Sequence, residues 1–266
     1  MNQNQYYDPE NFVDISAVDQ YAINAYVVRV FGWMFYGLLV TTLTTIAIII
    51  GTNSNAAFAD FVATTLEFTF IVLIVQLIMV WTMSARVHKM NPFTAKVLYT
   101  IYAALNGLTF GLIVYLFAVH YVGIATVGAA FGITAVSFGV MAIYGLTTQR
   151  DLTSFGSLLM MGLFGVIIAG FINWFLGSTM LEFLVLVGGL GLFLGIVAWK
   201  TNLIKNQYAQ VVLHGDNPDG TLTYEQEALA SNLAIHGALT LYLAFINIFL
   251  RVLLLLARAK GGGGRR

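Results

Sequence analysis

Ionisable side chains inside long apolar stretches are the residues of this sequence best placed to do chemistry. Five of them interrupt such stretches: Arg29, Glu67, Lys96, Glu182 and Arg251. A charge in lipid is costly, so it either lines a water-filled path or extends back to the membrane surface. Three of the five lie within about one helical turn of the end of an apolar stretch and can reach the surface. Glu67 and Arg251 lie about two turns inside and suit either arrangement.

Catalytic and metal-binding patterns are absent from the sequence. The chain has no cysteine, and its four histidines are dispersed without the spacing of metal ligands. Walker loops and HExxH or GxSxG motifs do not occur. The polar turn at residues 215–220 lacks both carboxylates that an EF-hand calcium loop requires. The sequence therefore predicts a protein that is not an enzyme and needs no cofactor.

Composition indicates the environment of these residues. Of 266 residues, 59 % are hydrophobic and only 9 % are charged, whereas soluble proteins carry about 25 % charged residues. Such a chain could not cover a water-exposed surface. The formal net charge is zero, so there is no basic field for nucleic acid. These values predict an integral membrane protein whose first partner is the lipid bilayer.

Seven apolar segments are long enough to span a bilayer as helices. They are residues 27–50, 61–83, 96–119, 121–144, 156–176, 180–199 and 232–257. The runs are continuous, unlike the short alternating strands of membrane barrels. The sequence thus predicts an all-α fold with a hydrophilic tail at 1–26, a membrane domain at 27–257 and a short basic tail at 258–266.

Basic residues predict the orientation of the spans. Lys and Arg occur in the second, fourth and sixth connectors and are missing from the first, third and fifth. The positive-inside rule then places the N-terminus in the cytoplasm and, after seven spans, the C-terminus outside. The basic C-terminal tail conflicts with that assignment, so the last apolar segment could instead re-enter and return. Its length favours a full crossing.

Small residues predict close helix packing at three places. Glycines recur four residues apart at 107 and 111, at 128 and 132, and at 191 and 195. Such pairs occupy one helix face and let a neighbouring backbone approach. They indicate a compact bundle without indicating an activity.

Two stretches resemble the signatures of a known family. Residues 144–152 read Tyr-Gly-Leu-Thr-Thr-Gln-Arg-Asp-Leu, and residues 241–249 read Leu-Tyr-Leu-Ala-Phe-Ile-Asn-Ile-Phe. Both resemble segments of bacterial members of the Bax inhibitor-1 family, also called the transmembrane Bax inhibitor motif family. The resemblance extends from about residue 27 to residue 251, and the spacing between the two stretches also fits.

The resemblance implies a fold and a function. Family members have seven transmembrane helices, six of them packed in two layers around a central seventh. They are associated with calcium leak across membranes, with suppression of cell death in eukaryotes and with stress responses. Bacterial relatives are described as pH-sensitive calcium leak channels of the inner membrane, and some interact with a membrane-anchored quality-control protease.

The family's pH-sensing pair of aspartates is replaced in this sequence. Lys200 stands where the first aspartate would end the sixth span, and Ala244 stands where the second would lie in the seventh. Two close carboxylates share a proton and titrate as a pair near neutrality, which Lys200 and Ala244 cannot do. Arg86 is the nearest counterpart of the basic residue that meets the pair in the family.

Two functions remain open from the sequence. The first is a leak for calcium or another cation, with oxygen ligands from Glu67, Asp151 and Asn247. The second is a non-conducting protein that modulates a membrane protease or a stress response, which the loss of the aspartates favours. An intramembrane enzyme would lack any catalytic pairing. The residues also predict a nearly flat pH response of any leak.

Overall fold

The computed structural model describes residues 19–55, 60, 69–116, 123–148, 150, 152–213 and 222–262. The helices in these ranges are α1 (Gln20–Ser54), α3 (Thr69–Ala85), α4 (Pro92–Leu116), α5 (Ile124–Thr147), α6 (Phe155–Leu176), α7 (Thr179–Leu213) and α8 (Tyr224–Gly262). One helix corresponds to each predicted span. The all-α class is therefore confirmed, and the described residues form no strand.

Five of these helices are long and apolar enough to cross a membrane: α1, α5, α6, α7 and α8. The described part of α3 is shorter, and the first residues of its predicted span, 61–68, lie outside the described ranges. The α4 helix has 25 residues, enough to cross a hydrocarbon layer of about 30 Å. Together the helices make a multi-pass membrane protein.

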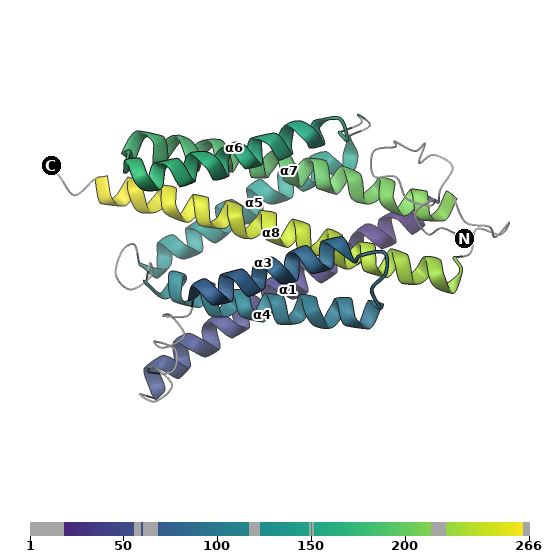
Figure 1. Cartoon of the computed structure of the whole chain (residues 1–266), viewed down its shortest axis with the longest axis horizontal. Helices are drawn as coiled ribbons and strands as arrows, with labels where there is room; N and C mark the ends of the chain where they lie inside the picture. Colours follow the sequence, from purple (N-terminus) through teal and green to yellow (C-terminus); the bar gives the residue numbers. More distant parts are fainter. Residues whose placement is uncertain are drawn as a thin grey trace.

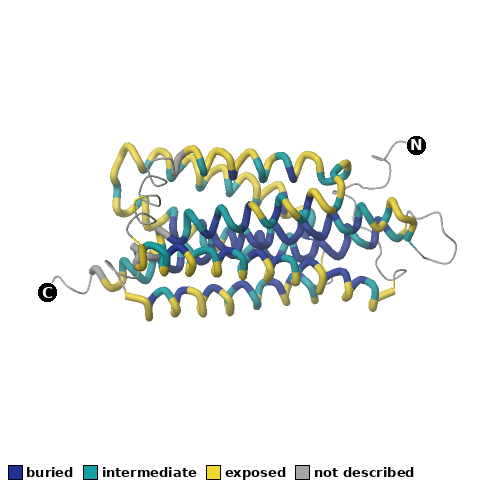
Figure 2. The backbone as a smooth tube through the Cα atoms, turned by 90° about the horizontal axis from the view of Figure 1, so that it is seen from below, coloured by how far each residue is buried: buried dark blue, intermediate teal, exposed yellow. Residues whose placement is uncertain are grey.

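The α8 helix is the most buried element of the bundle. It contacts α1, α4, α5 and α7, and its middle residues Leu239, Leu241, Tyr242 and Ile248 are almost fully buried. Figure 1 shows α8 between a group formed by α1, α3 and α4 and a group formed by α5, α6 and α7. In Figure 2 the buried backbone is concentrated in the middle of the bundle. In α6 only Gly156 is buried. The exposed apolar surface of α6 suits contact with lipid.

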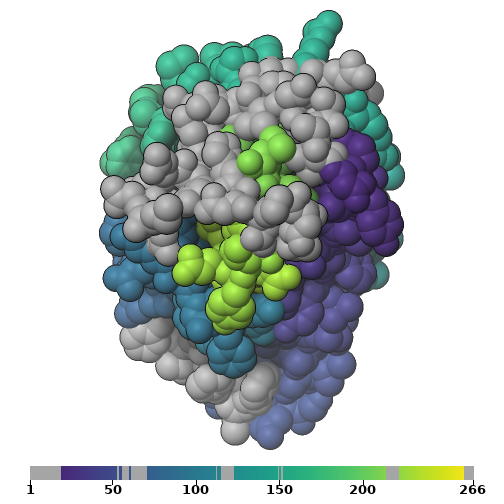
Figure 3. Space-filling view, turned by 90° about the vertical axis from the view of Figure 1, so that its right-hand side faces the viewer, coloured from purple at the N-terminus to yellow at the C-terminus, as the bar shows by residue number. Residues whose placement is uncertain are grey.

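The two ends of the bundle differ in charge. The described residues of the α3–α4, α5–α6 and α7–α8 connectors lie at the end where α1 begins, and α8 ends at the other (Figure 1). We call the first the basic end, because it holds Arg86, Lys89, Lys96, Arg150 and Lys205. Figure 3 views this end, where the starts of α1 and α8 meet the end of α7. The start of α1 and the end of α8 therefore lie at opposite ends of the bundle, as an odd number of crossings requires.

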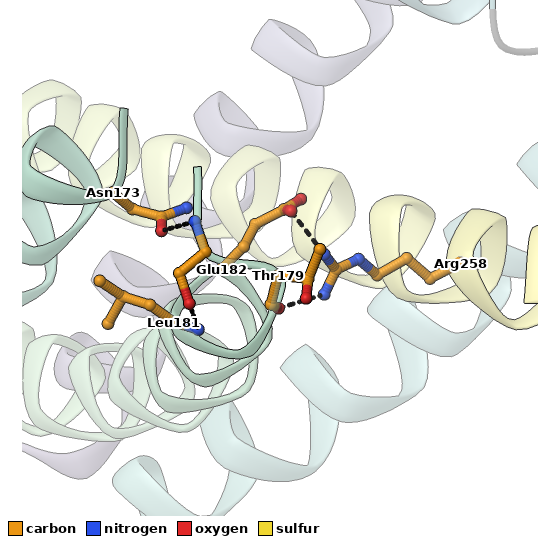
Figure 4. Close-up of polar contacts among 6 residues, drawn as sticks. Asn173, Thr179, Leu181, Glu182 and Arg258 are labelled. Atoms are coloured by element: carbon orange, nitrogen blue, oxygen red, sulfur yellow. Dashed lines mark hydrogen bonds and ion pairs between the residues drawn. The ribbon is translucent and has the colours of Figure 1, made fainter. Parts of the chain in front are cut away.

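Capping residues set the turn between α6 and α7 at the opposite end. Gly177 adopts the left-handed conformation with φ of 59° and closes α6, with its N–H bonded to the carbonyl of Asn173 at 2.8 Å. Ser178 then accepts a hydrogen bond from the N–H of Leu181 at 3.3 Å (Figure 4). The turn is short, so α6 and α7 pack side by side.

Three helices extend more than five residues beyond the predicted spans at the basic end. The α1 helix begins at Gln20 within the predicted tail, α7 continues past residue 199 to Leu213, and α8 begins at Tyr224. The prediction of residues 200–231 as a connector was therefore wrong for most of that stretch. Its polar residues continue the helix because they pack against protein rather than lipid; Thr201, Asn202 and Asn206 are at most 2 % exposed.

Candidate functional site

A cavity of about 780 Å³ lies at the basic end, between the two groups of helices. Its walls come from the end of α3 and the following turn, the start of α6, the second half of α7 and the first half of α8. Polar side chains of this lining include Ser84, His88, Ser154, Ser157, Lys200 and His236. Two adjoining recesses hold only about 10 Å³ each. We therefore take the large cavity as the candidate site.

Lys200 is the one lysine or arginine among the described residues that line this cavity. Its Nζ lies 4.2 Å from the centroid of the Trp199 ring, which gives a cation–π contact. Among the described residues no carboxylate or carbonyl lies within hydrogen-bonding distance of Nζ. An ammonium partly removed from water without an acceptor is costly, so this group favours a negatively charged neighbour.

Two histidines lie in the same lining as Lys200. The Nε2 atom of His236 on α8 lies 3.3 Å from the Ser84 hydroxyl at the end of α3, which ties these two helices together. His88 lies in the turn between α3 and α4, where burial lowers its pKa below the usual 6.5. His88 is therefore mostly neutral at pH 7 and gains charge only in more acidic solution.

The start of α6 forms the wall that faces α7. Ser154 occupies the N-cap position without making a side-chain cap, and the first turn contains no acidic residue. At Gly156 an added Cβ would lie 2.5 Å from Cζ2 of Trp199, so only glycine lets the indole ring rest there. This contact fixes the ring over which Lys200 lies. The N-terminus of α6 adds a modest positive potential to the wall.

The two positions matched to the family's aspartates have different surroundings. Lys200 lines the cavity and an adjoining recess that includes Gly237 and Thr240. Ala244 lies one turn beyond Thr240, is 2 % exposed within the core and does not line the cavity. As they stand, the two side chains therefore do not share one cavity.

The other predicted site residues are scattered. Arg86 is exposed at the start of the α3–α4 turn. Asn247 is half-buried on α8, and its Nδ2 donates to the carbonyl of Leu243 at 2.8 Å. Glu67 and Asp151 lie outside the described residues.

Arg251 follows neither arrangement expected for it. It packs between α7 and α8, with Nη1 donating to the carbonyl of Val185 at 2.7 Å and the guanidinium 5.3 Å from the Phe193 ring centroid. Gly189 makes room for it, because an added Cβ there would overlap the guanidinium. The charge is thus held by protein rather than by a water path or the membrane surface.

Comparison with known proteins supports the resemblance noted in the two signature stretches. The sequence model of the family described as "Inhibitor of apoptosis-promoting Bax1" matches residues 23–261. The inner membrane protein YbhL of Escherichia coli K12 is 35 % identical over 234 residues, which cover 87 % of this chain and 90 % of YbhL. The chain belongs to the Bax inhibitor-1 family. An uncharacterized protein of Borreliella burgdorferi is 32 % identical over 89 % of this chain and 93 % of its own length.

The first Bax inhibitor-1 signature stretch has a clear structural role in this chain. At Gly145 an added Cβ would lie 2.3 Å from the carbonyl oxygen of Ala198, so glycine allows α5 and α7 to touch backbone to backbone. Asn202 Nδ2 donates to the carbonyl of Gly145 at 3.3 Å, and Lys205 Nζ donates to that of Leu146 at 2.6 Å. The α7 side chains thereby satisfy carbonyls left free where α5 ends.

Sequence reasoning missed two contributions to this region of the Bax inhibitor-1 bundle. Lys205 caps α5, and His236 pairs with Ser84 and so joins α8 to the end of α3. A signal for Lys205 existed, since helix ends attract cations and α5 has none in its last turn. The pairing of His236 with Ser84 joins residues 152 positions apart, and nothing local in the sequence indicates it.

Proposed function

We propose that this chain is a slow leak for calcium or another cation in the bacterial inner membrane, with the pH-sensing pair replaced by Lys200 and Ala244. The observation that carries the proposal is the cavity at the basic end, which is lined by one of the two replaced positions. Membership in the family and the inner-membrane location stated for YbhL support the location and the role. Calcium would be cargo, and the proposal requires neither a cofactor nor catalysis.

Two features argue that the leak is weak. Lys200 places a positive charge in the cavity and repels a cation that enters it. Beyond the cavity, the middle of α8 is closely packed, with Leu241 and Tyr242 at 0 % exposure. Cations could then cross only when the helices move apart.

Oxygen ligands for a cation remain available along the proposed path. Asn247 uses Nδ2 for a bond within α8, and no described residue donates to its Oδ1 atom. Glu67 and Asp151 would add carboxylates, the ligands that hard cations such as calcium prefer. In the same proposal, Arg86 meets water or lipid headgroups rather than an aspartate pair.

The proposed leak has a nearly flat pH response. Lys200 and Ala244 replace both aspartates, so no coupled pair of carboxylates remains to titrate near neutrality. Of the two cavity histidines, His88 has its pKa lowered by burial and would add positive charge only in acid. That charge would oppose cation entry further, so acid should not increase the leak.

Calcium flux into reconstituted vesicles tests the proposal between about pH 6 and 8. The parent should leak slowly and with little pH dependence. The double variant Lys200→Asp with Ala244→Asp should leak faster and switch over about one to two pH units, because two coupled carboxylates titrate together. Each single change should do less. Lys200→Asn with Ala244→Asn is the uncharged control of matched size, and a steep pH switch in the parent would overturn the proposal.

The positive charge of Lys200 also favours a second function, in which the protein conducts no ions. A cavity whose cation is Lys200 suits a protein that conducts nothing and instead modulates a membrane-anchored protease or a stress response. Under this alternative the parent and the asparagine control show no flux above empty vesicles. Copurification of a membrane protease with the tagged chain would then support it.

A further inference from the structure

We propose that the cavity at the basic end binds a phosphate group, with Lys200 as its central cation, and that the source is the headgroup of an anionic phospholipid. The inference concerns what fills the cavity and holds whether or not the chain conducts cations.

The uncompensated charge of Lys200 is the first observation. Its ammonium has an aromatic ring at 4.2 Å and no acceptor among the described residues. A cation–π contact offsets only part of the cost of removing an ammonium from water. An anionic oxygen in the cavity would supply the missing acceptors through charge-assisted hydrogen bonds.

The rest of the lining agrees with an anionic ligand. It offers hydroxyl groups at Ser84, Ser154 and Ser157 and imidazoles at His88 and His236, and its described residues include no carboxylate. The acidic residues of α8 nearest in sequence, Glu225 and Glu227, are exposed in the first turn of the helix. Glu227 precedes Leu233, the first lining residue of α8, by about 9 Å along the helix axis.

Size and position favour a lipid headgroup over a free ion. A volume of about 780 Å³ is far larger than one phosphate needs and lies in the range of organic ligand sites. Basic pockets between transmembrane helices on the cytoplasmic side bind anionic headgroups, because that leaflet is negatively charged. The basic end of this bundle is the end that the positive-inside rule assigns to the cytoplasm. Exposed Arg86, Lys89 and Arg150 at the same end would add long-range attraction.

Lipid binding to the purified full chain tests the inference. The chain in detergent is titrated with phosphatidylglycerol, with phosphatidylcholine or with inorganic phosphate, and bound ligand is measured by native mass spectrometry and by thermal shift. Phosphatidylglycerol should bind, and Lys200→Gln should weaken it about tenfold, the effect of losing one charged hydrogen bond. Lys89→Gln removes an exposed cation outside the lining and should change affinity less than about twofold.

A second variant keeps the test decisive if Lys200→Gln folds poorly. Ser157→Glu places a carboxylate in the lining, where it can pair with Lys200 and exclude the ligand. Phosphatidylglycerol binding should fall, and the variant without added lipid should melt above the lipid-free parent. Phosphate binding that Lys200→Gln abolishes, without phosphatidylglycerol binding, would keep the phosphate site but replace its source. Equal binding of both lipids, or binding unaffected by both cavity variants, would overturn the inference.

Discussion

At the scale of single residues, two cations of the basic end have opposite surroundings. Lys205 is 9 % exposed and donates to the carbonyl of Leu146 at 2.6 Å. Arg86 is exposed in the turn directly after α3, and its side chain has no partner among the described residues. The charge of Lys205 is thus used inside the protein, whereas that of Arg86 faces the surroundings.

Replacing each of these cations by methionine should separate the two roles. Lys205→Met leaves carbonyls at the end of α5 without a donor, and we expect a loss of about 1.5–3 kcal/mol of stability. Arg86→Met should cost less than about 1 kcal/mol, as for exposed charges. Unfolding of both variants in mixed micelles measures the difference. Equal losses would show that the capping contact contributes nothing.

The two positions that replace the aspartates show how far a sequence can define a site. The residue types at 200 and 244 were readable, and so was the loss of a titrating pair. The surroundings of Lys200 were not readable, because Ser84, Ser154 and His236 reach the cavity from three separate helices. Residues so far apart in sequence meet only through the packing of the bundle.

At the scale of helices, glycines four residues apart do not always mark a contact. Gly107 lies against Thr44 and the carbonyl of Thr41 on α1, as its spacing predicted. Gly128 and Gly132 have no atom within 4 Å of an added Cβ. The spacing shows only that two glycines share a face; whether that face meets a helix or lipid depends on the whole bundle.

Gly145 and Gly139 on α5 give a matched pair for testing close packing. Gly145→Ala would push a Cβ against the backbone oxygen of Ala198, and α5 and α7 would have to separate. We expect a loss of about 1–3 kcal/mol. Gly139→Ala meets no atom within 4 Å and should be neutral, or stabilising by up to about 1 kcal/mol, because alanine favours the helix. Thermal unfolding measures both, and similar melting temperatures for both variants would contradict the contact.

Helix positions were predicted well and helix lengths poorly, for one physical reason. Hydropathy indicates where a helix meets lipid, so the apolar runs located the seven helices that the described residues form. It does not report where a polar helix meets protein. Asn206 and Gln210 on α7 are almost fully buried, yet as polar residues they counted as part of a connector.

At the scale of the whole molecule, the basic residues near the C-terminus are tied to the end opposite the basic one. Arg258 pairs with Glu182 at the start of α7 at 2.5 Å (Figure 4), and Lys260 Nζ donates to the Thr126 hydroxyl at the start of α5 at 2.6 Å. The positive-inside rule disfavours a basic tail outside the cell. Here an ion pair and a hydrogen bond within the protein engage two of the cations of the tail, which reduces the conflict with a C-terminus on the outside.

Reporter fusions test this topology. A reporter after Arg266 should behave as external, and the same reporter inserted after Arg150 should behave as cytoplasmic, because an odd number of crossings separates the two. Glu182→Gln should leave both signals unchanged if seven crossings set the topology. Cytoplasmic signals at both positions would contradict a full crossing by α8.

The lengths of α7 and α8 have a mechanical consequence. With 35 and 39 residues they measure about 52 and 58 Å, against a hydrocarbon layer of about 30 Å. At the basic end both continue past the apolar spans predicted for them, α7 through residues 200–213 and α8 from residue 224 to residue 231. We call these two extensions the stalk. Lys200 and His236 lie close to where the stalk joins the predicted spans, one on each helix, and both line the cavity. A partner that bends or twists the stalk would move both helices and so change the spacing of the two cavity walls without entering the membrane.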